Sequence, residues 1–260
     1  LFLIFTDCKK DDSPIAEDPK EDSGDNIEDD PSPPTTDVAT ELTANDLSEH
    51  PMQDIARPEY LETIVDPSFG TIIRRISNGV DGTITKPMYS TVQAWNADES
   101  LMILYERGTG HQLLNGIDYS FIRYLDDIDP KDIEQIFWDF NDPDVLFYID
   151  GDTAELTKYN VSTQTKEEIV NLRALTSCAD NIGSGTDVQM MSWNSDVIGF
   201  RCDNTAAYAY RISTNELITF DLNDVAYTAP MPGPSGNTFY HGTRVYDSKG
   251  ILTLALNENK

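Results

Sequence analysis

The sequence predicts an all-β protein, a β-propeller built from four-stranded antiparallel blades. The prediction rests on a motif that recurs along the chain, in which an aromatic residue precedes a short polar turn and an apolar strand. The motif begins at four anchor residues, Trp95, Trp138, Trp193 and Tyr246. Successive anchors are 43, 55 and 53 residues apart, spacings in or near the repeat lengths of propeller blades. Nearly all the Trp, Tyr and Phe lie beyond Tyr60, so one folded region is expected there.

The clearest copy of the motif covers residues 88–105. We expect a strand at 89–95, a turn of residues that tolerate tight-turn dihedrals at 96–100, and an apolar strand at 101–105. Together these segments predict a β-hairpin, the inner half of a blade. The same hairpin is expected at residues 138–148, at 193–200 and, more loosely, at 246–254.

A second kind of hairpin predicts the outer half of each blade. Residues 60–76 form two short predicted strands around the turn 66–70. Further outer hairpins are expected at 156–169 and 207–220, and a fourth joins 119–124 to 126–130. An inner and an outer hairpin make one four-stranded blade, and blades stack radially because a single blade cannot bury both of its faces.

The repeating unit, which spans residues 60–256, resembles the WD40-like repeats of TolB-type propellers. In those repeats a Trp or Tyr precedes a polar turn and an apolar strand. Propellers have about four to eight blades, and this chain supplies an outer half-blade, three full units and one hairpin. We therefore expect an incomplete fragment of a larger propeller. A compact propeller of four blades is the alternative.

The N-terminus carries an apolar run, residues 1–5, that is too short to span a bilayer and lies just before Cys8. Together with the Lys and Asp residues that follow, it resembles the lipoprotein signals of Bacteroidetes-type bacteria. The resemblance implies a lipid on Cys8 and a place on the outer face of the outer membrane. An ordinary secretory signal with an incidental Cys is the alternative. The predicted organisation is a signal remnant at 1–8, a disordered acidic tether at 9–56 and propeller blades at 57–260.

The charge and composition of the chain restrict the classes of molecule that it can bind. The formal net charge is −28, and phosphate binding needs clusters of Lys and Arg that this chain lacks, so nucleic acid is excluded as a partner. The expected partners are the membrane, through the lipid anchor, and a polysaccharide or protein ligand bound by a monomer. No metal-site spacing is present and no cofactor is indicated. Cys178 and Cys202 are predicted either to form a disulfide in an oxidising compartment or to remain as buried thiols.

Candidate catalytic residues occur close together only near the C-terminus. Tyr240, His241 and Arg244 resemble by type the sites of propeller-fold polysaccharide lyases. The resemblance implies that His241 is the base, Tyr240 the acid, and Arg244 the neutraliser of a uronate carboxylate. The alternative is a Tyr-His-Gly turn with Arg in a surface pair. His111, with Arg107 before it, is a second candidate beside glycines that also suit an ordinary turn.

No residue constellation identifies a reaction, so the functional prediction is a binding one. The leading hypothesis is a surface lipoprotein whose propeller binds an extracellular polymer or protein. The alternatives are a polysaccharide lyase that acts by β-elimination and a periplasmic scaffold like the TolB propeller. The Trp residues recur in step with the blades, so they are predicted to be buried markers of the core rather than platforms for sugar rings.

Overall fold

The structure is a computed structural model that describes residues 45, 47, 52–79, 82–185, 188–220 and 228–255. Cys8 and nearly all of the predicted tether lie outside these residues. The chain divides into two compact units, Leu1–Ile76 and Ser77–Lys260. The described residues are almost entirely β-structure, with one short helix, α1 (Leu172–Thr176). In this part of the chain no helix is long and apolar enough to cross a membrane.

The first unit contains an antiparallel hairpin of β1 (Thr63–Val65) and β2 (Ile72–Arg74). Its turn is closed by the Asp66 N–H, which donates to the Thr71 carbonyl at 2.8 Å, and by the Gly70 N–H, which donates back to Asp66 at 2.8 Å. Gly70 has φ +69°, a conformation that favours glycine. The predicted hairpin at 60–76 is confirmed.

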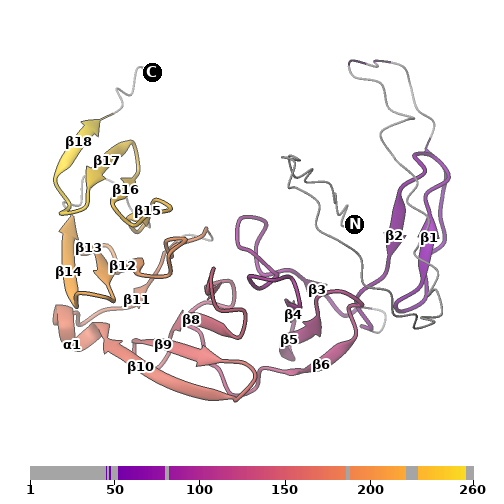
Figure 1. Ribbon diagram of the computed structural model, residues 1–260, viewed down its shortest axis with the longest axis horizontal. Helices are drawn as coiled ribbons and strands as arrows, with labels where there is room; N and C mark the ends of the chain where they lie inside the picture. Colours follow the sequence, from indigo (N-terminus) through magenta and orange to yellow (C-terminus); the bar gives the residue numbers. More distant parts are fainter. Residues whose placement is uncertain are drawn as a thin grey trace, which may run out of the picture. The chain divides into compact units, whose positions relative to one another are not determined.

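The described residues of the second unit form four antiparallel sheets of four strands each, and within every sheet the strands are neighbours in chain order (Figure 1). The first sheet contains β3 (Thr85–Lys86), β4 (Leu101–Glu106), β5 (Gly110–Asn115) and β6 (Phe121–Tyr124). The second contains β7 (Ile136–Trp138), β8 (Val145–Ile149), β9 (Glu155–Asn160) and β10 (Thr165–Asn171). The third contains β11 (Ile182–Gly183), β12 (Val197–Cys202), β13 (Ala206–Arg211) and β14 (Glu216–Phe220). The fourth contains β15 (Met231–Pro232), β16 (Thr238–His241), β17 (Arg244–Asp247) and β18 (Leu252–Ala255).

The core lies between the sheets. All five residues of β8 are buried, as expected for a strand covered on both faces. Between the third and fourth sheets the Phe220 ring meets Phe239 at 5.0 Å and Tyr246 at 5.2 Å. A Cβ on Gly199 in β12 would lie 1.7 Å from the Pro230 carbonyl oxygen, so the close approach of these two sheets requires glycine.

Polar groups also join neighbouring sheets. The indole N–H of Trp138 on the second sheet donates to the Ala94 carbonyl beside the first, at 3.0 Å. The Arg123 guanidinium on β6 donates to the Tyr159 hydroxyl at 2.8 Å and to the Val161 carbonyl at 3.1 Å. The sheets therefore contact each other through specific hydrogen bonds as well as apolar packing.

Two predicted strands are wrong. Within residues 89–95 the chain makes a turn, with the Val92 N–H donating to the Tyr89 carbonyl, and then forms only an isolated bridge from Trp95 to Met102 of the next strand. The first sheet begins instead at β3. The segment 126–130 is not the partner of β6, which pairs with β5. Three Asp residues and Pro130 disfavour a strand there, because Asp is a poor strand former and Pro lacks an N–H. The predicted outer hairpins at 156–169 and 207–220 are confirmed as β9–β10 and β13–β14.

Candidate functional site

Four equivalent turns join the first and second strand positions of the four sheets. In each, a backbone N–H donates to a carbonyl five or six residues later, at 2.7–3.1 Å. The donor and acceptor are Asn96 and Leu101, Asp139 and Val145, Ser192 and Val197, and Gly233 and Thr238. We call the segments 96–101, 139–145, 192–197 and 233–238 the inner turns.

Short polar side chains close the first three inner turns. Asn96 Oδ1 accepts from the Leu101 N–H at 2.9 Å, and Ser192 Oγ accepts from the Val197 N–H at 2.9 Å. Asp139 Oδ1 accepts from two backbone N–H groups, at 2.7 and 3.1 Å. Asn, Asp and Ser favour such turns because their side chains bond to the nearby backbone.

The register of the turns corrects two of the predicted anchors. The residue just before each turn pairs across to the second strand, and these residues are Trp95, Trp138, Met191 and Pro232. The third core position is therefore Met191, which is 1% exposed, whereas Trp193 lies two residues later and is 59% exposed. Tyr246 lies on the third strand of its sheet rather than before an inner turn. Trp138, at 3% exposed, is a buried core residue as predicted.

The second residue of each inner turn occupies an apical position. We call these four residues, Ala97, Phe140, Trp193 and Pro234, the apical ledge. Backbone N–H groups of the ledge residues link successive turns, because the Trp193 N–H donates to the Pro234 carbonyl at 3.0 Å and the Phe140 N–H donates to the Ser195 side-chain Oγ at 3.2 Å. The Phe140 and Trp193 rings stack, with centroids 6.0 Å apart and planes 28° apart. The ledge therefore runs across neighbouring sheets.

A small pocket of about 130 Å³ lies between the first two inner turns, beside the ledge. It is lined by Gln93, Trp95, Asn96, Ala97, Glu99, Trp138, Asp139 and Phe140. Phe140 lines the pocket and also stacks on Trp193, so pocket and ledge form one surface. Among the described residues, the side chains of Gln93 and Glu99 and the Oδ2 atom of Asp139 have no hydrogen-bond partner.

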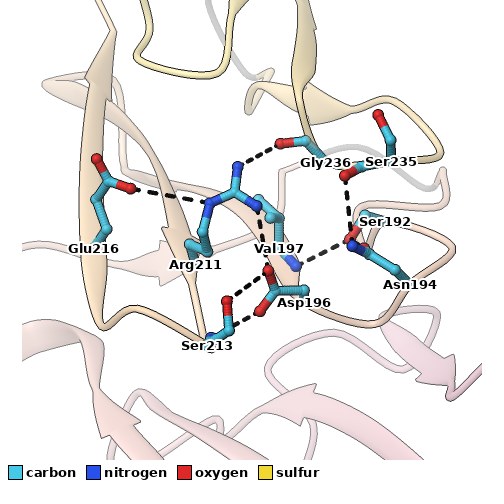
Figure 2. Close-up of polar contacts among 9 residues, drawn as sticks. All are labelled: Ser192, Asn194, Asp196, Val197, Arg211, Ser213, Glu216, Ser235 and Gly236. Atoms are coloured by element: carbon cyan, nitrogen blue, oxygen red, sulfur yellow. Dashed lines mark hydrogen bonds and ion pairs between the residues drawn. The ribbon is translucent and has the colours of Figure 1, made fainter.

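Figure 2 shows how the turn that carries Trp193 is anchored to its own sheet. The Arg211 guanidinium of β13 forms an ion pair with Asp196 at 3.2 Å and donates to the Gly236 carbonyl at 2.7 Å. Asp196 also accepts from the Ser213 N–H at 2.7 Å and its hydroxyl at 2.9 Å. The Arg211 and Asp196 side chains are only 12% and 18% exposed, so this pair is mostly shielded from water.

The same turn is also tied to the inner turn of the fourth sheet. The Ser192 hydroxyl donates to Asn194 Oδ1 at 2.6 Å, and Asn194 Nδ2 donates to the Ser235 carbonyl at 3.4 Å (Figure 2). With the backbone bond from Trp193 itself, these contacts hold the turn on both sides. The exposed indole of Trp193 is therefore carried on a rigid backbone.

His111 is placed as a structural residue. It is 6% exposed, its Nε2 lies 2.7 Å from the Ile133 carbonyl, and its ring packs at 5.1 Å from the Tyr105 ring. Burial lowers the pKa of His111, which keeps the imidazole neutral. Arg107, on the preceding turn, donates its backbone N–H to the Ile84 carbonyl.

The structure places Arg244 beside His241 but turns Tyr240 to the other face of the sheet. Tyr240 and His241 are successive residues of β16 and so point to opposite faces of the sheet. Tyr240 is 44% exposed, whereas His241 is 1% exposed with Nε2 at 3.3 Å from the Thr228 carbonyl. Burial, with a smaller effect from the charge of Arg244, lowers the pKa of His241. Arg244 pairs with His241 across a two-residue turn. Base and acid therefore share no common face.

Cys178 and Cys202 form a disulfide, with Cα atoms 5.8 Å apart. The bond joins the segment after α1 to the end of β12. Among the described residues no group of three or more His, Cys, Asp or Glu is placed to hold a metal ion.

Comparison with solved structures identifies the fold as a β-propeller. An oligogalacturonate lyase from Vibrio parahaemolyticus is 14% identical, with a TM-score of 0.54 over 76% of this chain and 60% of that one. The four sheets are propeller blades. A second similar structure is an oligogalacturonate lyase in complex with manganese. It is 11% identical, with a TM-score of 0.49 over 75% of this chain and 58% of that one. TolB from Acinetobacter baumannii is similar too, at 11% identity and a TM-score of 0.42 over 74% of this chain and 47% of that one.

These blades span about 60% or less of the length of the neighbouring structures. At 14% identity the likeness to the Vibrio lyase shows the fold alone. No family model and no curated protein matches the sequence. The function of the blades must therefore be argued from their own residues.

Sequence reasoning missed one residue of this surface and two that lie beneath it. Phe140, Met191 and Arg211 were not singled out, although Phe140 and Trp193 both follow an Asp or Ser that begins a polar turn. Aligning the turns on that polar residue, rather than on the nearest aromatic, places Trp193 with Phe140. The sequence therefore held a signal for the apical ledge.

Proposed function

We propose that the propeller is a recognition module that binds an extracellular polymer along the apical ledge. The observation that carries the proposal is Trp193, a large apolar side chain that is 59% exposed on a firmly held turn. Rigid exposed aromatics contribute much contact area at little entropic cost, and Trp is enriched among residues that dominate binding energies. The pocket beside Phe140 adds polar groups that are available to a ligand.

We also propose that the module is a lipoprotein of the outer cell surface, attached through Cys8. Support comes from the signal-like residues 1–8, from the acidic composition of residues 9–56, and from the Cys178–Cys202 disulfide, a bond typical of exported proteins. Metabolic labelling with a fatty-acid probe is expected to mark the wild-type protein and not Cys8→Ser. Equal labelling of the two proteins would contradict the anchor.

The lyase alternative has less support. A general base must reach the proton that it removes, and His241 is buried with its ring against the Thr228 carbonyl. A lyase would generate an unsaturated uronate that absorbs in the ultraviolet. With pectate as substrate we expect no rise in absorbance, and a rise that disappears in His241→Ala would favour the lyase instead. No particular contact favours the scaffold role.

Affinity electrophoresis tests the binding proposal. The full chain is run through gels that contain a polysaccharide, with glucans, mannans, xylans, galactans and pectate as the panel. At least one polymer is expected to retard the wild-type protein and to retard Trp193→Ala much less. Phe121→Ala is the matched control, because Phe121 is a 45% exposed aromatic on β6, outside the ledge. Equal retardation of Trp193→Ala and wild type, or no retardation by any polymer, would refute the proposal.

A further inference from the structure

We infer that the ligand of the apical ledge is a neutral polysaccharide, not a uronate polymer. The inference rests on the proposed function and narrows it to one chemical class. Three features favour this class: the charges around the pocket, the polar groups that face it, and the repetition of the apical position along successive blades.

The charges around the ledge disfavour an anionic ligand. The pocket is lined by Glu99 and Asp139 and by no Lys or Arg. Arg211 of β13, which anchors the turn that carries Trp193, is already engaged by Asp196, by the Gly236 carbonyl and, at 3.9 Å, by Glu216. With a formal net charge of −28 on the whole chain, a row of uronate carboxylates would meet repulsion without a compensating cation.

The polar groups of the pocket suit hydroxyl donors. Glu99 and Asp139 Oδ2 are acceptors and Gln93 offers both an acceptor and a donor, and none of them is used by another described residue. A pyranose ring presents an apolar C–H face and a rim of hydroxyl groups. Its face can pack on an indole while its hydroxyls donate to carboxylates, in charge-assisted bonds stronger than neutral ones. The exposed indole is that of Trp193 on the ledge, and the acceptor groups line the pocket beside it, so the two features together suit such a ring.

The geometry of the ledge suits a repeating ligand. The apical residues occupy the same position in successive inner turns, and hydrogen bonds join neighbouring turns. A polymer that follows the turns would meet an equivalent position at each blade, with the strongest contact at Phe140 and Trp193. Carboxylates beside an indole would also attract a cationic peptide. However, Asp139 Oδ1 already accepts two bonds within its own turn, which offsets part of its charge.

Isothermal titration tests the inference with hexamer probes in three charge classes, two of them saccharides and one a peptide. The neutral set contains hexamers of glucose, mannose, xylose and galactose, the anionic probe is hexagalacturonate, and the cationic probe is hexalysine. We expect at least one neutral hexamer to bind, with an affinity that changes less than about twofold between 50 and 500 mM salt, because no ion pair is formed. Hexagalacturonate and hexalysine are expected not to bind.

Variants connect the binding to the ledge. Trp193→Ala is expected to lower the affinity for the neutral hexamer by about tenfold or more. Glu99→Gln is expected to lower this affinity by a few-fold, because a charged acceptor is lost. Phe121→Ala should leave affinity unchanged. Binding of hexagalacturonate in preference to every neutral hexamer, abolished by Trp193→Ala, would overturn the inference and leave the proposed function standing. Binding of hexalysine alone, or of no probe, would overturn both.

Discussion

Two tryptophans that look alike in the sequence are expected to differ sharply in their effect on stability. Trp138 is 3% exposed and donates its indole N–H to the Ala94 carbonyl at 3.0 Å, whereas Trp193 is 59% exposed and packs mainly on Phe140. Removing a buried Trp side chain costs about 3–5 kcal/mol. Removing the exposed one costs about 1 kcal/mol or less, the scale of an aromatic pair.

Urea unfolding followed by circular dichroism measures the difference. With a denaturant slope of about 2 kcal/mol per molar, Trp138→Ala should lower the urea midpoint by roughly 1.5–2.5 M, and Trp193→Ala by about 0.5 M or less. Trp138→Phe is the matched control, since it keeps most of the ring and loses chiefly the indole hydrogen bond, a cost of about 1 kcal/mol from that bond. Similar midpoints for Trp138→Ala and Trp193→Ala would refute the assignment of Met191, rather than Trp193, to the third core position.

Two further predictions concern stability. Replacing Cys178 and Cys202 together by Ala should lower the free energy of unfolding by about 3.5 kcal/mol, the chain-entropy value for a sequence separation of 24, and a change below about 0.5 kcal/mol in urea unfolding would contradict a structural role. Burial lowers the pKa of His111 and His241 below the ordinary 6.5, so the unfolded chain binds protons that the folded chain does not. The free energy of unfolding should therefore fall as pH drops from 7.5 to 5.5, and fall less in the double variant His111→Gln/His241→Gln; equal losses in the two proteins would exclude these histidines as the cause.

Sequence periodicity predicted the blades well because their hairpins are local. The pairs β7–β8, β9–β10 and β13–β14 each join neighbouring runs of alternating or apolar residues, and the turn residues between them are strong local signals. The first strand of the first blade was misplaced, because β3 has only two residues and lies well before β4. A strand of that length carries no periodic signal.

The candidate site was harder to predict because it depends on register and on side-chain direction. Trp193 fitted the aromatic pattern, but it lies in the turn itself, and Met191, two residues earlier, holds the core position. Tyr240 and His241 are adjacent in sequence, and adjacency on a strand places side chains on opposite faces. The Arg211–Asp196 pair joins a residue of β13 to a turn residue 15 positions earlier, which composition does not reveal.

The backbone bonds of the apical ledge have a consequence for the variability of this surface. At Trp193 the main-chain N–H, and at Pro234 the main-chain carbonyl, make the bond between turns, so neither side chain supplies it. The side chain at an apical position can therefore change while the main-chain hydrogen bonds that hold the turn remain. Ala97 occupies the same position on the first blade, beside the pocket, and a larger side chain there would lengthen the aromatic surface while leaving the turn bonds intact. Ligand preference can thus change by single substitutions without rebuilding the blades.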